Sequence, residues 1–386
     1  MKNKIRKRIL YVMPDNPMGT RAGNLTRTNS LLKYFDRNFE EFDVDFVSYL
    51  YWDEESKLNF KQKFPKINLQ IVLTKMPKKN LFKYIFKSKI PKFFNRFKKK
   101  SKIDEVTPYL KFQFDCLQKE RQYDIALISY SSAGKIIKGW LETYCILDTH
   151  DFLTLQRLSK SKESNFFGEA FQEEINIMNL FDEIWTYSLE EHYIFDQFTN
   201  SNVKLVPVSS PVNSNDLAAP IKYSVLYVAS DNQHNVNSIQ WFINRVLPLL
   251  GNVKIYIVGK ICSKIQDEAN IVKLGLVNDL DAIYKQSKIT ICPMLSGTGV
   301  KIKVLESLSY GLPVVATRRG VDGLVNKSQN GCLIANEEKE FARYILKLLS
   351  DQTFYTQHQI EARSYFEKHH HPELETQFLD KTFMEV

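Results

Sequence analysis

The sequence predicts an α/β protein built from two doubly wound parallel sheets. Three observations lead to this expectation. The chain has 386 residues, about twice the ~100–200 residues of a typical single domain. Short apolar runs of strand length alternate with helical patterns in both halves, which is typical of βαβ units and a parallel sheet. A turn-forming segment at 209–223 separates the halves and is the best candidate for a linker.

In the first half, apolar runs of strand length begin close to the N-terminus. The first of them ends in a loop rich in Pro, Asn and Gly, and Leu31, Leu32 and Phe35 mark one apolar side of the helix that follows. We expect strands at 8–13, 43–50, 69–73, 124–129, 145–147, 183–186 and 204–206, and helices at 25–35, 169–180 and 189–197.

The same alternation restarts after the linker. We expect strands at 225–229, 254–258, 271–274, 289–293 and 313–316, and helices at 236–250, 280–287, 300–310, 339–349 and 352–368. The chain therefore divides into an N-terminal domain at 1–210, a C-terminal domain at 211–368 and a tail at 369–386 that we expect to return to the N-terminal domain. Two such sheets leave an inter-domain cleft at the carboxyl ends of their strands, where doubly wound proteins bind ligands.

The composition excludes several classes of protein. Apolar residues make up 44% and charged residues 25% of the chain, which is a globular balance, and Gly and Pro are too scarce for a collagenous chain. No apolar run approaches the ~18 residues of a membrane span, and the run at 9–13 is too short for a signal peptide. The five cysteines are far apart and lack metal-ligand spacing, which favours buried thiols in a reducing compartment. We therefore expect a cytoplasmic protein.

The net charge of +9 is concentrated in the segment 75–102. This segment contains twelve of the 53 Lys and Arg residues and no acid, so the rest of the chain has 41 basic residues against 44 acidic ones. Six aromatic side chains lie between these charges. Such a pattern suits an anionic membrane surface, on the inner face of the cell membrane, better than it suits nucleic acid. A solvated insertion whose aromatics pack onto the N-terminal core explains the pattern as well.

The segment that indicates chemistry is 289–323. A strand ends, a loop of small residues follows, and a helix is expected to begin near Val300. Gly297 and Gly299 let the backbone approach a ligand closely, and the amides beside Thr298 lie at the positive end of the helix dipole. This arrangement suits a phosphate or diphosphate. An ordinary crossover of an α/β sheet would explain a lone Gly-x-Gly loop equally well.

Charged side chains follow this loop. Lys301 and Lys303 lie in the first turn of the expected helix, where a cation is unfavourable for the helix itself and a bound anion would explain it. Glu306 lies further along the same helix, where its carboxylate can accept hydrogen bonds from a ribose diol. Together these residues predict a site for the diphosphate and ribose of a nucleotide.

The run 297–317 resembles the donor-site segment of GT-B glycosyltransferases, in particular the large retaining family that uses nucleotide-sugar donors (glycosyl transferases group 1, family 4-like). Members carry a Gly-rich loop, a helix holding a Glu, and then Gly-x-Pro-Val-Val-Ala-Thr; here these are 297–299, Glu306 and 311–317. Further stretches are similar to landmarks of the family: 19–27, 148–157, 182–188, 225–241 and 274–280. The resemblance implies a GT-B fold of two Rossmann-like domains, with the acceptor bound by the N-terminal one and the donor by the C-terminal one.

The resemblance also implies a function. The enzyme would be a hexosyltransferase-type glycosyltransferase that moves a sugar from a nucleotide diphosphate-sugar to a glycan or lipid-linked glycan, with retention and without a metal or other cofactor, in surface polysaccharide, lipopolysaccharide or glycoconjugate synthesis. The implied catalytic residues are His150, Lys303 and Glu306. The donor would contact Gly297, Thr298, Gly299, Val300, Lys301, Lys303, Glu306, Asn235 and Leu276, and the acceptor or a phosphate would contact Gly19, Arg21, Gly23 and Arg27.

Several of these assignments have alternatives. A capping or packing histidine between two aspartates would explain His150, and ordinary surface arginines would explain Arg21 and Arg27. The tract 369–371 contains three histidines, which we interpret as a polar surface rather than a metal site.

One departure from the family concerns the donor sugar. Many members hold a second glutamate eight residues before the position of Glu306, where this chain has Thr298. A threonine cannot supply that charge, so the identity of the sugar cannot be transferred by analogy. Two other functions stay open: a nucleotide-sugar epimerase on the same fold and, because Thr298 replaces a glutamate, a non-catalytic partner of another glycosyltransferase.

Overall fold

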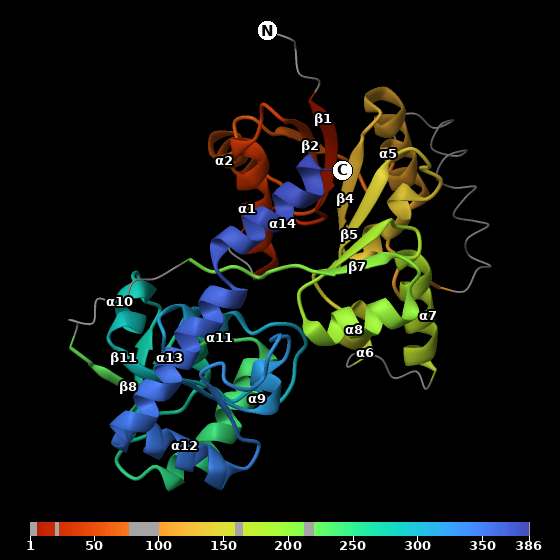
Figure 1. Cartoon of the computed structure of the whole chain (residues 1–386). Coiled ribbons are helices and arrows are strands. Elements are labelled where there is room, and N and C mark those ends of the chain that lie inside the picture. The colour runs from red at the N-terminus through yellow and green to blue at the C-terminus, as the bar shows by residue number, and fades with distance from the viewer. Residues whose placement is uncertain (1–5, 20–22, 77–99, 159–164, 212–219, 386) are drawn as a thin grey trace. The chain divides into compact units, whose positions relative to one another are not determined.

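The computed structural model in Figure 1 describes residues 6–19, 23–76, 100–158, 165–211 and 220–385. Most of the basic segment 75–102 therefore lies outside the described residues. The chain forms two compact units. Unit 1 comprises Met1–Thr186 and Glu191–Leu205, and unit 2 comprises Tyr187–Glu190 and Val206–Val386. Both units are parallel α/β sheets flanked by helices, as the sequence predicts; the cleft between them and the return of the tail stay predictions.

Unit 1 contains a seven-stranded parallel sheet in the order β3-β2-β1-β4-β5-β6-β7. The strands at its centre are buried on both faces and therefore read as nearly continuous apolar runs rather than as alternating patterns. The strands are β1 (Lys7–Val12), β2 (Phe42–Ser48), β3 (Asn68–Ile71), β4 (Ile125–Ser129), β5 (Tyr144–Asp148), β6 (Glu183–Thr186) and β7 (Asn202–Leu205).

The helices of unit 1 include two that the sequence does not reveal, α2 (Glu54–Lys63) and α5 (Pro108–Arg121). Only Phe60 is buried in α2, and only Leu110 and Phe114 in α5, so neither helix has a wide apolar face. Their signals are caps instead, since Asp53 accepts a hydrogen bond from the Ser56 amide at 2.7 Å and Thr107 caps α5 ahead of a proline. The other helices are α1 (Gly23–Arg37), α6 (Leu153–Leu158), α7 (Phe166–Met178), α8 (Leu189–Phe198) and a 3-10 helix, Ser131–Ile137.

Unit 2 contains a six-stranded parallel sheet in the order β10-β9-β8-β11-β12-β13. Its core is formed by the central strands and the apolar faces of the helices that cover them. The last strand was not predicted, because only one of its three residues is buried. The strands are β8 (Tyr223–Val228), β9 (Ile255–Val258), β10 (Ile271–Gly275), β11 (Ser287–Cys292), β12 (Val314–Ala316) and β13 (Cys332–Ile334).

The helices of unit 2 differ from expectation at two places. The single helix expected at 236–250 is an α-helix, α9 (Gln233–Trp241), followed by a π turn at Phe242–Val246 and a 3-10 turn at Leu247–Leu249, because Pro248 lacks the amide that a regular helix would need. The tail contains a helix, α14 (Pro372–Met384), capped by the His371 side chain. The others are α10 (Leu280–Lys285), α11 (Ile302–Ser309), α12 (Glu338–Ser350), α13 (Gln352–His369) and a 3-10 turn at Lys260–Lys264.

The histidine tract does not form the polar surface that we expected. His370 is buried, with 5% of its surface exposed, and its Nδ1 lies 2.9 Å from the Val208 carbonyl oxygen. Burial lowers the pKa of His370 to about 4, so the ring is neutral at physiological pH. The histidine therefore helps to fasten the segment after β7 to the end of α13.

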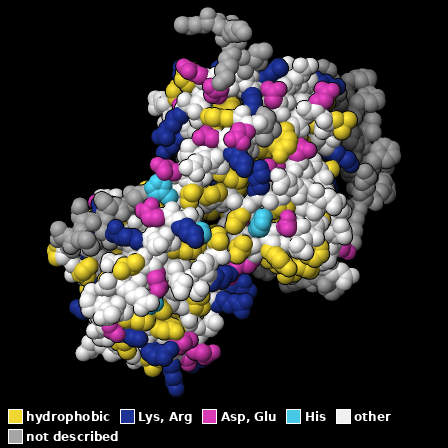
Figure 2. Space-filling model, in the orientation of Figure 1, with side chains coloured by type: hydrophobic (Ala, Val, Ile, Leu, Met, Phe, Trp, Pro, Cys, Tyr) yellow, Lys and Arg dark blue, Asp and Glu magenta, His cyan; other side chains and the backbone are white. Residues whose placement is uncertain are grey.

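The surface of the described residues mixes charges of both signs. Figure 2 shows basic and acidic side chains interleaved over the visible face. Among the described residues, no helix is both long and apolar enough to span a bilayer. All five cysteines are free thiols, and Cys145, Cys292 and Cys332 are buried.

Candidate functional site

The glycine loop of unit 2, residues 296–300, connects the region after β11 to helix α11. Gly297 and Gly299 have φ angles of +100° and +71°. Residues with a side chain rarely adopt such values. Thr298 between them is exposed. Helix α11 begins at Ile302, two residues later than expected. The loop thus exposes its backbone directly before a helix N-terminus, which is the geometry that binds anions.

A glycine outside the loop, Gly323, fixes the position of the loop. Gly323 has a φ of +89°, and a Cβ atom on it would lie 2.5 Å from Cγ2 of Val300. The Gly323 amide donates a hydrogen bond to Glu190 Oε2 at 2.8 Å, and the second oxygen of Glu190 pairs with Lys327. The sequence gives no signal for this contact, because Glu190 and Gly323 are 133 positions apart.

Lys303 is half-buried, and the two groups nearest to its ammonium are neutral. Its Nζ donates a hydrogen bond to Asn235 Oδ1 at 2.8 Å and lies 4.8 Å from the centre of the Tyr227 ring. Asn235 is itself fixed, because its amide group donates to the Ser230 carbonyl oxygen at 3.1 Å. Burial lowers the pKa of Lys303, since a cation loses its hydration there. Neither of these two partners carries a negative charge, while the charge of Glu306 on the same helix raises the pKa of Lys303 and that of Lys301 lowers it.

Glu306 lies one turn beyond Lys303 on α11. Its Oε2 accepts a hydrogen bond from the Tyr284 hydroxyl at 2.9 Å, and the Tyr284 ring stacks on Tyr310 with ring centres 5.0 Å apart. Burial raises the pKa of Glu306, while the hydrogen bond from Tyr284 and the charge of Lys303 lower it. The tyrosine thus orients a carboxylate that has further acceptor capacity for ligand hydroxyls.

The other predicted donor residues have different environments. Lys301 is the N-cap residue of α11 and only 9% exposed, and its Nζ donates to the carbonyl oxygens of Thr298 at 3.1 Å and Gly299 at 2.7 Å. It holds the glycine loop together from within, a role that the sequence did not suggest.

Leu276 is 73% exposed, in the turn between β10 and α10. The Ser296 hydroxyl lies 2.7 Å from Nδ1 of His234.

A second polar cluster lies in unit 1, where strands β4 and β5 end. Asp148 is the last residue of β5, and its Oδ2 lies 3.6 Å from Nε of Arg27 and 3.4 Å from Nε2 of His150. The His150 ring stacks on Tyr130 with ring centres 4.7 Å apart. The Arg27 guanidinium lies 5.9 Å from the centre of the Trp185 ring. We call Arg27, Asp148 and His150 the acceptor-side cluster.

The structure places the remaining residues of the predicted acceptor loop only in part. Gly19 is exposed, and its amide donates to the Asn16 carbonyl oxygen at 3.4 Å. Gly23 is the first residue of α1. Arg21 lies outside the described residues, and Arg27 is in the second turn of α1.

Burial lowers the pKa of His150. The carboxylate of Asp148 raises it, the charge of Arg27 lowers it, and Asp151 and Asp15 raise it further. The net direction is downward, so His150 is neutral at physiological pH. A neutral imidazole has one donor and one acceptor nitrogen, which is the pairing that a hydroxyl group requires.

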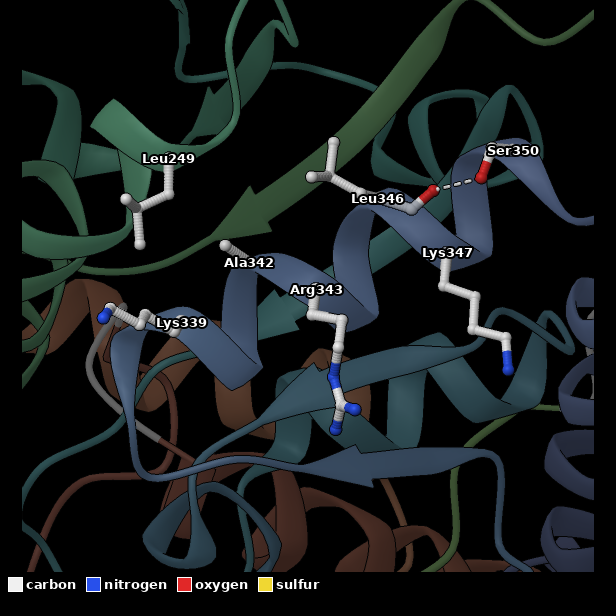
Figure 3. Close-up of a pocket in the computed structure, with 7 residues that line it drawn as sticks. All are labelled: Leu249, Lys339, Ala342, Arg343, Leu346, Lys347 and Ser350. Carbon is white, nitrogen blue, oxygen red and sulfur yellow. Dashed lines mark hydrogen bonds between the residues drawn. The ribbon is translucent and has the colours of Figure 1, made fainter.

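A shallow groove of about 560 Å³ lies elsewhere in unit 2, on helix α12 (Figure 3). None of the predicted site residues lines it; its walls are Leu249, Lys339, Ala342, Arg343, Leu346, Lys347 and Ser350. In the part of the chain that the structure describes, no group of three or more His, Cys, Asp or Glu residues could hold a metal ion. The expected independence from metals stays a prediction.

Comparisons with known proteins concern unit 2 and the fold as a whole. Residues 222–351 match the family model of Glycosyl transferases group 1. A protein of Klebsiella pneumoniae, described as an uncharacterized 44.6 kDa protein in the cps region, is 30% identical over 129 residues, which cover 29% of this chain and 33% of that relative. The match thus spans about a third of the relative's length.

Solved structures show the fold of the whole chain. Sucrose-phosphate synthase from Thermosynechococcus elongatus is similar with a TM-score of 0.71 and 13% identity, over 98% of this chain and 99% of that one. Anabaena HepE in complex with UDP is similar with a TM-score of 0.68 and 14% identity, over 98% and 100% of the two chains. The chain therefore has the GT-B fold, and its residues 222–351 are similar to the domain that the Glycosyl transferases group 1 model describes.

Proposed function

We propose that this protein is a glycosyltransferase that moves a sugar from a nucleotide diphosphate-sugar to a hydroxyl group of a glycan or lipid-linked glycan, with retention and without a metal ion. The observation that carries the proposal is the environment of Lys303. Its ammonium group lies beside the neutral Asn235 and Tyr227, one residue into the helix that follows the glycine loop.

The arrangement suits a diphosphate leaving group. Negative charge grows on the diphosphate as the glycosidic bond breaks, and fixed donors placed where that charge develops lower the barrier. Lys303 and the amides at the start of α11 are such donors. Attraction between charges is stronger in a partly buried site than in water, so a cation whose direct contacts are neutral has a large effect there.

Glu306 would bind the nucleoside part of the donor. Its carboxylate is oriented by Tyr284 and can accept hydrogen bonds from two hydroxyl groups of a ribose. It lies on the same helix as Lys303 and one turn further on, so the ribose and diphosphate contacts follow each other along α11.

Retention follows from the family resemblance. In a front-side attack the leaving phosphate takes the proton of the acceptor hydroxyl, so no strong general base is needed. His150 would then orient a hydroxyl group rather than remove its proton. The neutral state of its ring, which burial favours, is suited to this role.

The names of the relatives support a first choice of ligands. Structures of Anabaena HepE were solved with UDP and UDP-glucose, and S. aureus TarM with UDP and alpha-GlcNAc-glycerol. The Klebsiella relative belongs to a cps region. We infer a UDP-sugar donor and a role in surface polysaccharide or glycoconjugate synthesis, with the basic segment 75–102 bringing the enzyme to an anionic membrane surface.

The test is a thermal-shift screen with UDP, GDP and their common sugar conjugates, followed by an assay of nucleotide release with an acceptor panel. We expect a stabilising nucleotide-sugar, since a ligand that binds only the native state raises its melting temperature. Lys303→Met should reduce this shift strongly. Lys288→Met is the matched control, because Lys288 is also a partly buried lysine of unit 2 but donates to the Leu349 carbonyl oxygen at 3.0 Å.

The same experiment separates the other functions. Nucleotide release that depends on an acceptor supports the transferase. Conversion of one nucleotide-sugar into another without an acceptor would show an epimerase, and binding without any turnover would indicate a non-catalytic partner. No shift with any nucleotide or nucleotide-sugar would refute the donor site.

A further inference from the structure

We propose that Arg27 is a positioning residue of the acceptor-side cluster: it compensates the charge of Asp148, leaves His150 as an uncharged imidazole, and makes the cluster a site for a hydroxyl group rather than for a phosphate. The identity of that hydroxyl group, as part of the acceptor, rests on the proposed function. The charge state of the cluster does not.

Two basic side chains share one carboxylate oxygen. Nε of Arg27 and Nε2 of His150 lie 3.6 and 3.4 Å from the same Oδ2 atom of Asp148. The exposed side-chain fractions are 12% for Arg27, 0% for Asp148 and 4% for His150. Charges so close and so well buried influence each other strongly. Arginine keeps its proton at all accessible pH values, so it is the partner that Asp148 always has.

The local structure holds the three groups in place. The main chain of β4 and β5 brings them together, since the Tyr130 amide donates to the Asp148 carbonyl oxygen at 2.8 Å. Tyr130 and His150 have φ angles of +69° and +54°, a backbone conformation that is costly for residues with a side chain and is concentrated at functional sites. The strained backbone of Tyr130 and His150 accompanies the stacking of their two rings beside Asp148.

Other titratable groups also face His150. Asp15 from the loop after β1 and Asp151 after β5 act on its charge, and burial raises the pKa of both carboxyls. Tyr11 on β1 is buried, which raises the pKa of its hydroxyl far above the physiological range. Glu105 acts on Asp15 and raises its pKa. The strongest pair around His150 is thus Asp148, which favours a protonated ring, and Arg27, which opposes it.

The charge balance decides between the two classes of ligand. Arg27 and Asp148 cancel, and a neutral His150 adds nothing, so the cluster offers a phosphate no net attraction, and the carboxylate of Asp148 repels it. A hydroxyl group can donate a hydrogen bond to the acceptor nitrogen of a neutral imidazole, whereas a fully ionised phosphate has no proton to donate. We therefore assign Arg27 to charge compensation, in place of the phosphate contact that the sequence predicts.

The first test measures the titration of His150 by NMR of the full-length protein with 13C-labelled histidine. The chain has seven histidines, and His150→Gln identifies the signal of interest. In Arg27→Met we expect the titration midpoint of His150 to move to higher pH, because an opposing cation is removed. In Asp148→Asn it should move to lower pH. Arg27→Lys keeps the charge and should keep the midpoint, so it also covers the case in which Arg27→Met does not fold.

Two control variants change residues that lie on or contact the same elements, α1 and β5, but away from the cluster. Arg37 is the last residue of α1, about 15 Å along the helix axis from Arg27, and Asp182 accepts a hydrogen bond from the Cys145 amide near the amino end of β5. Arg37→Met and Asp182→Asn should leave the midpoint unchanged. A midpoint in Arg27→Met equal to that of the unchanged protein would overturn the proposal.

The second test uses inorganic phosphate as the probe. We expect no saturable change of the His150 signal on titration with phosphate, and a saturable change would refute the preference for a hydroxyl group. Neither test measures sugar transfer. If the proposed transferase activity were refuted, both tests could still be interpreted. If both tests contradicted the role of Arg27, the proposed donor site of unit 2 would not be affected.

Discussion

Each unit holds a half-buried cation near the carboxyl ends of its central strands, but the two cations have different neighbours. In unit 2, Lys303 contacts an amide oxygen and the face of an aromatic ring. In unit 1, Arg27 lies beside the carboxylate of Asp148 and the face of Trp185. Both cations therefore have an aromatic neighbour, and the difference lies in the carboxylate.

This difference predicts which unit binds phosphate. A buried cation without a counter-ion is costly in the free protein and gains most when an anion arrives. A buried cation with a counter-ion is already stabilised, and it contributes to the structure instead. On this view the diphosphate of the donor belongs to Lys303, while the acceptor-side cluster interacts with uncharged groups.

The largest expected effect concerns stability, and Asp148→Asn measures it. Removal of one partner from a buried pair leaves the other charge uncompensated, so we expect a loss of about 3 kcal/mol in the free energy of unfolding. Lys303→Met, by contrast, removes a cation that forms no salt bridge with another described residue, although the charge of Glu306 lies nearby, so it should change the free energy of unfolding less than Asp148→Asn does. Urea denaturation of both variants checks the contrast. Equal losses of unfolding free energy in the two variants would contradict the proposed difference between the environments of Arg27 and Lys303.

The sequence predicted the architecture better than the site. Strand β6 was predicted at its observed bounds, because Ile184, Trp185 and Thr186 are residues that favour strands. Helix α2 was missed because Phe60 is its one buried residue, and β13 because only one of its three residues is buried, whereas all three residues of β12 are buried. Length and burial thus decide which elements can be predicted from local patterns.

The same distinction holds for the candidate site. The glycine loop, Lys303 and Glu306 lie within ten positions of each other, so their pattern could be seen in the sequence. Their partners could not, because Asn235 is 68 positions from Lys303 and Tyr284 is 22 positions from Glu306. The compensation of Arg27 by Asp148 is equally invisible, since only the order of strands in the sheet brings α1 and β5 together.

The second prediction concerns the affinity for nucleotide. Lys303→Met should weaken the binding of UDP by about 30-fold, since a hydrogen bond to a charged group contributes about 2 kcal/mol. Isothermal titration calorimetry measures the loss, and Lys288→Met again serves as the control. The comparison between the units would fail if Lys303→Met bound UDP as tightly as the unchanged protein does.

The smallest expected effect uses the different acidities of lysine and arginine at position 303. Burial lowers the pKa of Lys303, whereas the guanidinium of an arginine stays charged. The affinity for UDP should therefore decline on the alkaline side, in a window below the ordinary lysine pKa of ~10.4, because the lysine loses the charge that attracts the diphosphate. In Lys303→Arg this decline should be weaker by a few-fold. Ionisation of the ligand is the same with both proteins and cancels in the comparison, so parallel pH profiles would mean that Lys303 is not the group that holds the diphosphate.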